Sequence, residues 1–331
     1  MSKPVIAFGV MCSKEATPAV RQLIAALGQD QPVFVHHDHR KSPRFAVDQP
    51  NVRFVQEPLD TGWGTWGFVQ AIVQTMRIAL EQSKFEYFQL LSGSCLPIKS
   101  NVQFEQMVAN RSHDVNMGLI SLDENTDAMM SHGYRVFARD ESLRYRLLLR
   151  ARKWYLSGNT VTLQKSGLGI QQLTDSARRS MSLGGRVAVS FTSMARHGKI
   201  FHHPFREGLT PYIGSTWFGC SRAVCEYLVN RSQDDPFEAY YRETKLIDES
   251  YFHTLIGNSK FSIGPSNHFI SDFVESHPRQ IETLDIVRLR QSPAFFARKF
   301  GFALDDPTRM AALELCENTE TVSQSESTRT L

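Results

Sequence analysis

Short apolar runs alternate with amphipathic segments through the first 91 residues of the chain. Residues 5–11 form an apolar run of strand length, and residues 17–27 repeat apolar side chains at helical spacing until Gly28. The same alternation predicts further strands at 32–36, 52–55 and 87–91 and a helix at 68–80. Apolar runs that alternate with amphipathic helices are typical of an α/β domain with a mainly parallel central sheet.

Polar residues follow three of these predicted strands. In parallel sheets, ligands bind beyond the carboxyl ends of the strands. We expect those ends near Cys12, at residues 36–40 and at residues 92–94. The chain contains no GxGxxG, GxxxxGK[ST] or GxSxG motif, which removes the main support for a nicotinamide enzyme, a P-loop protein or an α/β-hydrolase.

Composition narrows the class of protein further. The 331 residues include 37 basic and 34 acidic side chains, so the net charge of +3 gives no global field that would attract nucleic acid. Five scattered cysteines without a CxxC pair indicate a reduced, intracellular compartment. No apolar run reaches the length of about 18 residues that spans a bilayer. We therefore expect a soluble protein or one attached peripherally to a membrane.

Two pairs of charged residues in the last third of the chain suggest chemistry. Asp248 and Glu249 precede an apolar helical stripe, and Arg298 and Lys299 are adjacent in sequence. A carboxylate can accept a proton, and a cation pair can hold a phosphorylated leaving group, which suits a transferase that uses an activated sugar. Each pair alone also has a simpler interpretation, because acidic residues favour the first turn of a helix and adjacent cations often lie in solvent.

A histidine-rich strand end offers a metal-binding alternative. Adjacent residues of a strand point to opposite faces, so only His37 and His39 of the segment 36–39 could share one side. No second pair with ligand spacing is evident. We favour Asp38 as a nucleotide contact, and a metal-dependent hydrolase or phosphotransferase that uses His37, Asp38 and His39 remains the alternative.

Six segments, in order along residues 4–303, resemble glycosyltransferase family 14, which contains the core-2/I-branching N-acetylglucosaminyltransferases and the peptide O-xylosyltransferases. The last two are closest to the xylosyltransferase branch. The segments are FVHHD (34–38), WGTWG (63–67), LLSGSCLPIKS (90–100), GSTWF (214–218), ESYFHT (249–254) and FFARKF (295–300).

The resemblance implies a GT-A-like, Rossmann-like α/β fold with a mainly parallel central sheet flanked by helices. It also implies a UDP-sugar donor and an inverting mechanism without a metal or other cofactor. We expect one domain over residues 1–305, with a nucleotide-binding part at about 1–121 and an acceptor-binding, catalytic part at about 122–305. Residues 306–331 would form an extension whose tail, from about Glu317, is disordered.

The same resemblance assigns roles to individual residues. It places the catalytic base at Glu249, the diphosphate contacts at Arg298 and Lys299, and a uridine contact at Asp38 with Val10 alongside. Further contacts are expected at Trp63 and Ser92 for the donor and at Asp248, Thr216 and Trp217 for the acceptor.

The sequence also departs from the family pattern. Cys95 stands where the family has Asp, and Thr65 replaces the second Gly of Trp-Gly-Gly. The chain lacks the membrane anchor and the disulfide-rich composition of eukaryotic members. We therefore expect a bacterial cytoplasmic enzyme that transfers xylose or N-acetylglucosamine to a glycan or lipid-linked acceptor during surface polysaccharide synthesis. A non-catalytic glycan- or nucleotide-binding module is a further alternative.

A basic helix predicted near residues 143–155 has three possible uses. Its stripe of Leu143, Leu147, Ala151 and Trp154 or Tyr155 is flanked by four arginines and a lysine. The stripe could face the core with solvated cations, lie in an anionic membrane interface at the inner face of the cell membrane, or line a cleft for an acidic acceptor.

Overall fold

The computed structural model describes residues 3–13, 17–28, 30–158, 160–196, 198, 200–205, 208–231, 236–274 and 277–327. The strands are β1 (Ile6–Cys12), β2 (Val33–His37), β3 (Val52–Phe54), β4 (Tyr87–Ser92), β5 (Leu96–Pro97), β6 (Val115–Asn116), β7 (Ile120–Ser121), β8 (Thr160–Lys165), β9 (Leu168–Leu173), β10 (Tyr212–Ile213), β11 (Gly219–Ser221), β12 (Ile263–Gly264), β13 (Phe269–Ser271), β14 (Phe273–Val274), β15 (His277–Pro278) and β16 (Phe296–Arg298). The α-helices are α1 (Thr17–Ala26), α2 (Trp66–Gln82), α3 (Asn101–Ala109), α4 (Thr126–Phe137), α5 (Leu143–Leu156), α6 (Asp175–Arg179), α7 (Leu183–Arg196), α8 (Arg222–Val229), α9 (Pro236–Tyr241), α10 (Tyr251–Gly257), α11 (Ile286–Gln291) and α12 (Pro307–Ser327), and the 3-10 helices are η1 (Ile247–Glu249) and η2 (Thr283–Asp285).

A seven-stranded mixed sheet forms the centre of the molecule, in the order β12-β6-β11-β4-β1-β2-β3. The four strands β3, β2, β1 and β4 are parallel neighbours, while β11 runs antiparallel to both β4 and β6. The predicted mixed α/β architecture with a mostly parallel sheet is confirmed. Because β11 and β12 come from the later part of the chain, this one sheet joins the two parts that the sequence divided near residue 121.

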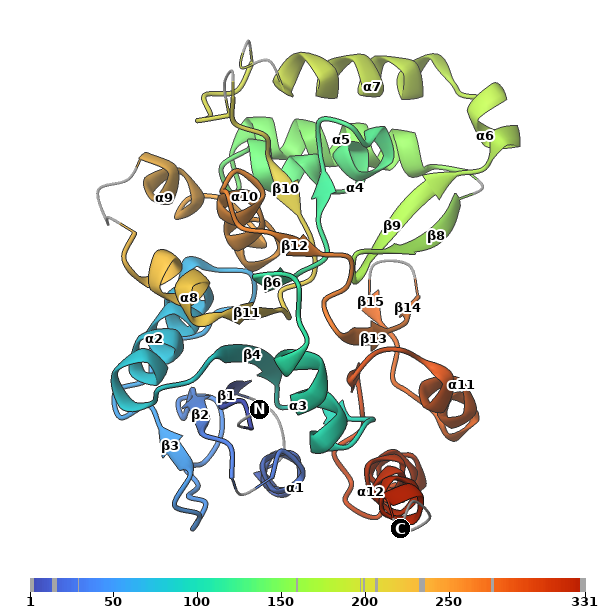
Figure 1. Ribbon diagram of the computed structural model, residues 1–331. Helices are drawn as coiled ribbons and strands as arrows, with labels where there is room; N and C mark the ends of the chain where they lie inside the picture. Colours follow the sequence, from blue (N-terminus) through green and yellow to red (C-terminus); the bar gives the residue numbers. More distant parts are fainter. Residues whose placement is uncertain are drawn as a thin grey trace.

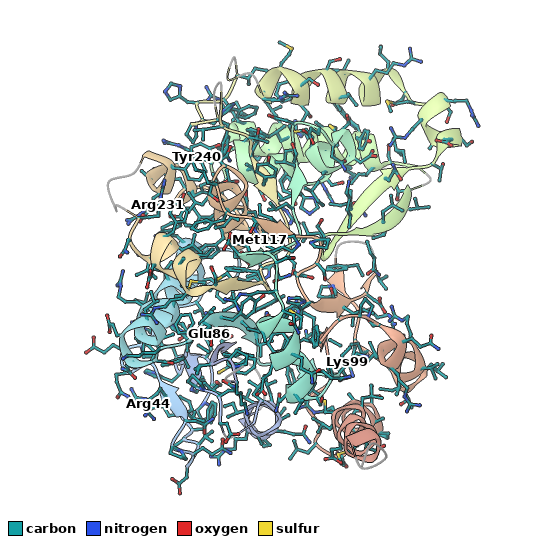
Figure 2. The ribbon with its side chains drawn as sticks, in the orientation of Figure 1. Arg44, Glu86, Lys99, Met117, Arg231 and Tyr240 are labelled. Carbon is teal, nitrogen blue, oxygen red and sulfur yellow. The ribbon has the colours of Figure 1, made fainter. Side chains whose placement is uncertain are left out.

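Alternating side chains of β1 enter two separate cores. Ala7 and Met11 pack on the side of α2 and α8, whereas Phe8 and Val10 pack on the side of α1 and α3. Figure 1 shows these helices on opposite faces of the sheet. All seven residues of β1 are buried, as expected for a strand covered on both faces. Met117, labelled near the centre of the molecule in Figure 2, belongs to the larger core.

A second layer of helices lies beyond one end of the sheet. Helices α4, α5 and α7 pack together there with the β8–β9 hairpin (Figure 1). A small core joins the layer, made of Met130, Ala151, Tyr155, Leu173 and Ala188. In the described residues, no helix has the length and apolar character needed to cross a bilayer.

The C-terminal helix α12 is tied to α1 by one buried arginine. The Arg309 guanidinium is fully buried and donates to Gln22 Oε1 at 2.8 Å, to the Gly301 carbonyl at 2.8 Å and to the Ala19 carbonyl at 3.2 Å. Helix α12 continues to Ser327, and the end of the tail that was predicted to be disordered from about Glu317 lies outside the described residues. That segment contains no Gly or Pro to end the helix.

Replacing Arg309 tests this connection. We expect Arg309→Met to lower the free energy of unfolding by about 2–4 kcal/mol, because the carbonyls of Ala19 and Gly301 and the side-chain amide oxygen of Gln22 lose their donor. Urea unfolding measures the change. Met310→Ser on the same helix is the matched control, since the Met310 side chain is 46% exposed, and it should change stability by no more than about 0.5 kcal/mol. Equal effects of the two variants would contradict the proposed connection.

Candidate active site

A cleft of about 720 Å³ opens at the carboxyl ends of β1, β2 and β4. The sequence predicted a ligand site at this edge, and the cleft is lined by residues from distant parts of the chain. They are Met11, Cys12 and Ser13; His36 and Lys41; Thr61, Gly62, Trp63, Gly64 and Phe68; Ser92 and Ser94; Trp217 and Asp248; and Pro278, Arg298 and Lys299.

A small three-stranded sheet brings the cation pair to this edge. Strand β16, which ends at Arg298, lies between β13 and β5. The backbone of the next segment is fixed to the turn after β4, because the Phe300 amide donates to the Ser94 carbonyl at 3.0 Å. Arg298 and Lys299 therefore line the same cleft as Ser92 and Ser94, although about two hundred residues separate them in the chain.

The Arg298 side chain is positioned by an aromatic ring. Its guanidinium lies 5.0 Å from the centroid of the buried Trp217 ring. A cation held over an aromatic face is attracted to the ring, and this attraction limits the positions that the guanidinium can take. Lys299 is exposed at the cleft, so the two cations together can approach an anion from different directions.

Asp248 presents one carboxylate oxygen without a partner. Its side chain is buried and lines the cleft, and its Oδ2 accepts a hydrogen bond from Thr216 Oγ1 at 2.7 Å. The other oxygen, Oδ1, is buried and accepts no hydrogen bond from the described residues. Burial raises the pKa of Asp248, while the Thr216 hydrogen bond opposes the shift. A hydroxyl that entered the cleft could satisfy this oxygen.

Glu249 follows directly but is directed toward α4. Its Oε2 accepts a hydrogen bond from Arg135 Nη1 at 2.9 Å, and its carbonyl accepts one from the Gly214 amide at 2.9 Å. The side chain is 26% exposed and does not line the cleft itself. Burial raises the pKa of Glu249 to about 7, Arg135 opposes this shift, and the neighbouring Asp248 adds to it. The carboxylate is therefore poised to exchange a proton near neutral pH.

Asp38 and Val10, predicted to contact uridine, do not line the cleft. Asp38 is buried and accepts hydrogen bonds from the Thr61 amide at 2.8 Å, from Thr61 Oγ1 at 2.9 Å and from Arg40 Nη1 at 3.1 Å. Burial alone would raise the pKa of Asp38, but these bonds outweigh it and hold the pKa below its usual value. Asp38 thus positions Thr61, which does line the cleft. The Val10 side chain is buried in the core beneath.

The histidines around Asp38 do not converge on one point. His37 Nε2 lies 2.7 Å from Ser42 Oγ, and His39 Nε2 lies 3.0 Å from Arg44 Nη2. Across the described residues, no three His, Cys, Asp or Glu side chains are grouped as metal ligands. The arrangement of the side chains therefore gives the metal-dependent alternative no support.

Two departures from the family pattern now have a structural setting. Cys95 is fully buried, and its Sγ lies 3.1 Å from Ser92 Oγ, so it closes the turn after β4 while Ser94 faces the cleft. Thr65 precedes α2, and its hydroxyl donates to the Gly62 carbonyl at 2.9 Å. Trp63, on the same loop, is 76% exposed at the cleft.

Sequence reasoning missed Arg135 and Thr61. Arg135 lies 114 residues before Glu249, and nothing in its own segment of the sequence signals the contact. Thr61 could have been noticed, because it stands two residues before the Trp63 motif and a hydroxyl there suits a carboxylate at a strand end.

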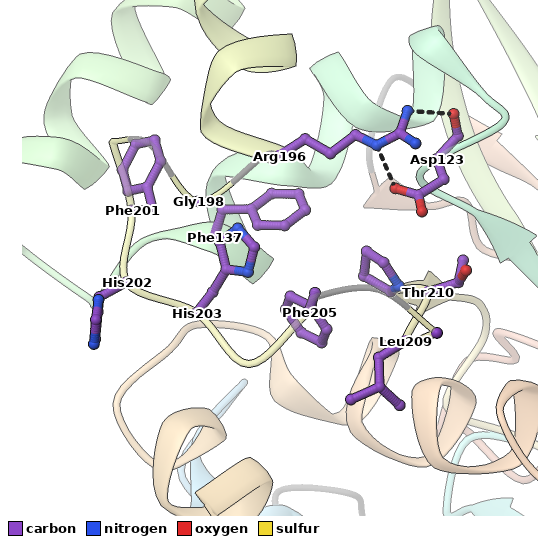
Figure 3. A pocket seen from close by; sticks show the side chains of 12 residues that line it. Asp123, Phe137, Arg196, Gly198, Phe201, His202, His203, Phe205, Leu209 and Thr210 are labelled. Atoms are coloured by element: carbon purple, nitrogen blue, oxygen red, sulfur yellow. Dashed lines mark hydrogen bonds and ion pairs between the residues drawn. The ribbon is translucent and has the colours of Figure 1, made fainter.

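A second cavity, of about 550 Å³, lies in the helical layer near α7 (Figure 3). Phe137, Phe201 and Phe205 line it together with His203. Two charged residues that line it form an ion pair with each other, in which Arg196 Nε lies 2.9 Å from Asp123 Oδ1. This cavity is away from the strand ends and lacks the carboxylate and cation pairs of the cleft, so the cleft is the better candidate site.

Comparison with known proteins points to one group of enzymes. Residues 6–137 match the family described as Core-2/I-Branching enzyme. The chain is 26% identical to Xylosyltransferase 1 of Canis lupus familiaris and 25% identical to Xylosyltransferase 2 of Homo sapiens, over 91% and 89% of its own length. A shorter match to a Xylosyltransferase of Ciona intestinalis is 34% identical and covers 28% of the chain.

The chain spans 29% and 32% of the length of the two relatives from dog and human. The family match ends at Phe137 and so covers the strand ends but neither of the charged pairs at 248–249 and 298–299. Together, the family match and the xylosyltransferase relatives support the relation to the Core-2/I-branching enzymes of glycosyltransferase family 14 that the six motifs indicated.

Proposed function

We propose that this protein is an inverting glycosyltransferase with a GT-A-like fold that transfers a sugar from a UDP-sugar to an acceptor hydroxyl. The observation that carries the proposal is the cleft at the strand ends, where Asp248 shares a wall with Arg298 and Lys299 and stands beside Glu249. Such a site places one carboxylate and a cation pair in the same cleft, with the second carboxylate, Glu249, next to Asp248 in the chain. The family relation supports the same activity.

Arg298 and Lys299 are proposed to hold the diphosphate of the donor. When the bond between the anomeric carbon and the phosphate oxygen breaks, the departing UDP keeps the electron pair and gains negative charge. Cations fixed at that position stabilise the charge without reorganisation. Arg298 is suited to the task because it lines the cleft with its guanidinium 5.0 Å from the centroid of the Trp217 ring, and a planar guanidinium can donate two parallel N–H bonds to phosphate oxygens.

Glu249 is proposed to be the general base. The acceptor hydroxyl would give its proton to the Glu249 carboxylate while its oxygen attacks the anomeric carbon opposite the leaving phosphate, which inverts the configuration. A base works best when its pKa lies near the working pH, and the pKa of Glu249 is raised to about 7. Arg135 keeps enough of the group ionised to accept the proton.

Asp248 is proposed to orient the acceptor. Its free oxygen, Oδ1, can accept a hydrogen bond from a second hydroxyl of the acceptor sugar, while Thr216 holds Oδ2 at 2.7 Å. Trp217 lines the same cleft on the proposed acceptor side, and the exposed Trp63 offers an aromatic face to the donor. On the donor side, Ser92, Ser94 and Thr61 would contact the nucleotide, with Asp38 acting through Thr61.

We further propose xylose or N-acetylglucosamine as the transferred sugar, since the relatives are named xylosyltransferases and Core-2/I-branching enzymes. A glycan or a lipid-linked glycan of a bacterial surface polysaccharide is the proposed acceptor, and the cytoplasm is the proposed location.

Substituting the two adjacent carboxylates separates their roles. Glu249→Gln should keep the dissociation constant for the UDP-sugar and lower turnover by about 10²–10⁴-fold, because the base is removed. Asp248→Asn should raise KM for the acceptor more than it lowers turnover. Steady-state UDP release with a panel of sugar acceptors measures both. Near-normal turnover of Glu249→Gln would exclude Glu249 as the base and leave Asp248 as the candidate.

The pH dependence provides a second test of the base. Glu249 is active when ionised, so kcat/KM should fall as the pH drops through about 7. Arg135→Gln removes the cation that favours the ionised form of Glu249, so this acidic limb should move to higher pH. Arg135→Lys keeps a cation at this position, so the limb should move less than in Arg135→Gln. Arg139→Gln is the control, because Arg139 pairs with the exposed Glu243 and should leave the profile unchanged. An unmoved limb in Arg135→Gln would refute the assignment.

Donor binding tests the cation pair. UDP-xylose or UDP-N-acetylglucosamine at about 100 times its dissociation constant should stabilise the protein by about 2.7 kcal/mol with EDTA present. Lys299→Ala should weaken UDP much more than uridine, whereas Lys260→Ala, at an exposed position outside the cleft, should affect neither. If EDTA abolishes activity and manganese restores it, the metal-independent mechanism is wrong.

A further inference from the structure

Helix α5 leaves part of its apolar surface uncovered. Its core-facing side chains are Leu148, Ala151 and Tyr155, which corrects the stripe predicted through Leu143 and Leu147. Leu143, Leu147 and Trp154 are instead 64%, 39% and 52% exposed. With 3.6 residues per turn, these three positions lie within about 40° of one another around the helix axis. They lie along one side of the helix.

Helix α7 repeats this arrangement beside α5. Gly185, Ala188, Thr192 and Ala195 are buried, while Leu183, Val187 and Met194 are 79%, 53% and 50% exposed at matching positions of the helix. The two helices pack against each other at one end of the molecule (Figure 1). A side-chain carbon at Gly184 would lie 3.8 Å from the Trp154 indole. The exposed strip of α5 therefore adjoins the start of α7 at Leu183.

The same two helices concentrate positive charge. They carry seven Arg or Lys side chains and no Asp or Glu, although the whole chain has a net charge of only +3. Arg146, Arg150 and Lys153 are exposed and lie next to the apolar strip around the axis of α5. Among the described residues, none of these three forms an ion pair with a carboxylate. The face is apolar along its middle and cationic along its edge.

We propose that this outer face of α5 and α7, called here the basic apolar face, binds the surface of an anionic lipid bilayer. Leucine, valine and methionine side chains gain free energy on leaving water, tryptophan favours the interfacial region, and arginine and lysine reach the lipid headgroups. The face fits no other partner class as well. A second copy would place cations against cations, and an acidic glycan would leave the aliphatic side chains in water.

This inference does not depend on the proposed transferase activity. It predicts contact at the interface only, because no helix in the described part of the chain could span a bilayer. It selects one of the three uses that the sequence left open for this helix, since Leu147 and Trp154 do not face the core and neither residue lines the cleft.

Vesicle flotation of the full chain tests the proposal. The protein should float with vesicles of phosphatidylcholine mixed with phosphatidylglycerol and not with phosphatidylcholine alone, and salt should reverse the binding. A cation near an anionic surface contributes about fivefold to partitioning, so Arg146→Glu with Arg150→Glu should weaken binding by at least about 25-fold. Leu147→Ser with Trp154→Ser should weaken it by at least about tenfold.

Matched controls lie outside the face. Leu284→Ser removes a leucine that is 91% exposed on η2, and Lys260→Glu reverses an exposed cation, so both should float like the unchanged protein. Unchanged melting temperatures of the test variants will show that they fold. Sedimentation velocity will show whether the protein forms a dimer, as expected if the face binds a second copy of the chain instead.

Three results would overturn the proposal. One is the absence of flotation with either kind of vesicle. Another is equal flotation of the test variants and the controls. The third is a dimer in solution that Leu147→Ser with Trp154→Ser converts to a monomer, because the face would then bind a second copy. Binding of heparin that depends on Arg146 and Arg150 but not on Leu147 and Trp154, without flotation, would assign the face to an acidic polysaccharide instead.

Discussion

The burial of Asp248 and the partial burial of the adjacent Glu249 are the constraint on which the rest of the site depends. A buried charge costs several kcal/mol unless a partner or a hydrogen bond compensates it. The fold supplies Arg135 from α4, Thr216 from the loop after β10, and Arg298 from the end of β16. These segments must meet at one place for the carboxylates to be tolerated. The small sheet of β13, β16 and β5, the helical layer and the central sheet are thereby joined around one electrostatic centre.

The partners at this centre compensate the charges of the two carboxylates only in part, and this leaves the carboxylates able to interact with a ligand. Asp248 Oδ1 has no donor among the described residues, and burial keeps the pKa of both carboxylates raised. A structure built only for stability would fill the cleft or pair the remaining oxygen. Buried polar atoms without a hydrogen-bond partner and carboxylates with raised pKa values are instead typical of sites that bind a ligand with hydroxyl groups and positive character.

The sequence predicted the features that depend on local patterns. Strands β1, β2, β3 and β4 were placed to within two residues, because their runs are short, apolar and bounded by polar residues. The position of the cleft was predicted from the carboxyl ends of the parallel strands. Arg298 was assigned to it because the motif FFARKF resembles a family segment. Contacts between distant segments could not be predicted: Arg135 meets Glu249 across 114 residues, and Asp38 turned out to hold Thr61. The buried side of α5 was misassigned because residues 147–149 are all leucine, so periodicity alone could not select Leu148.

The distribution of charge also shows why a net value says little about partners. A formal charge of +3 argues against a global field, yet α5 and α7 together carry seven cations without one carboxylate. The remainder of the chain must then be acidic on balance. Because screening limits electrostatic effects to about 8–10 Å at physiological salt, a partner responds to the local face and not to the sum. The cation pair of Arg298 and Lys299 at the cleft and the basic apolar face are therefore separate electrostatic features, and each can act without the other.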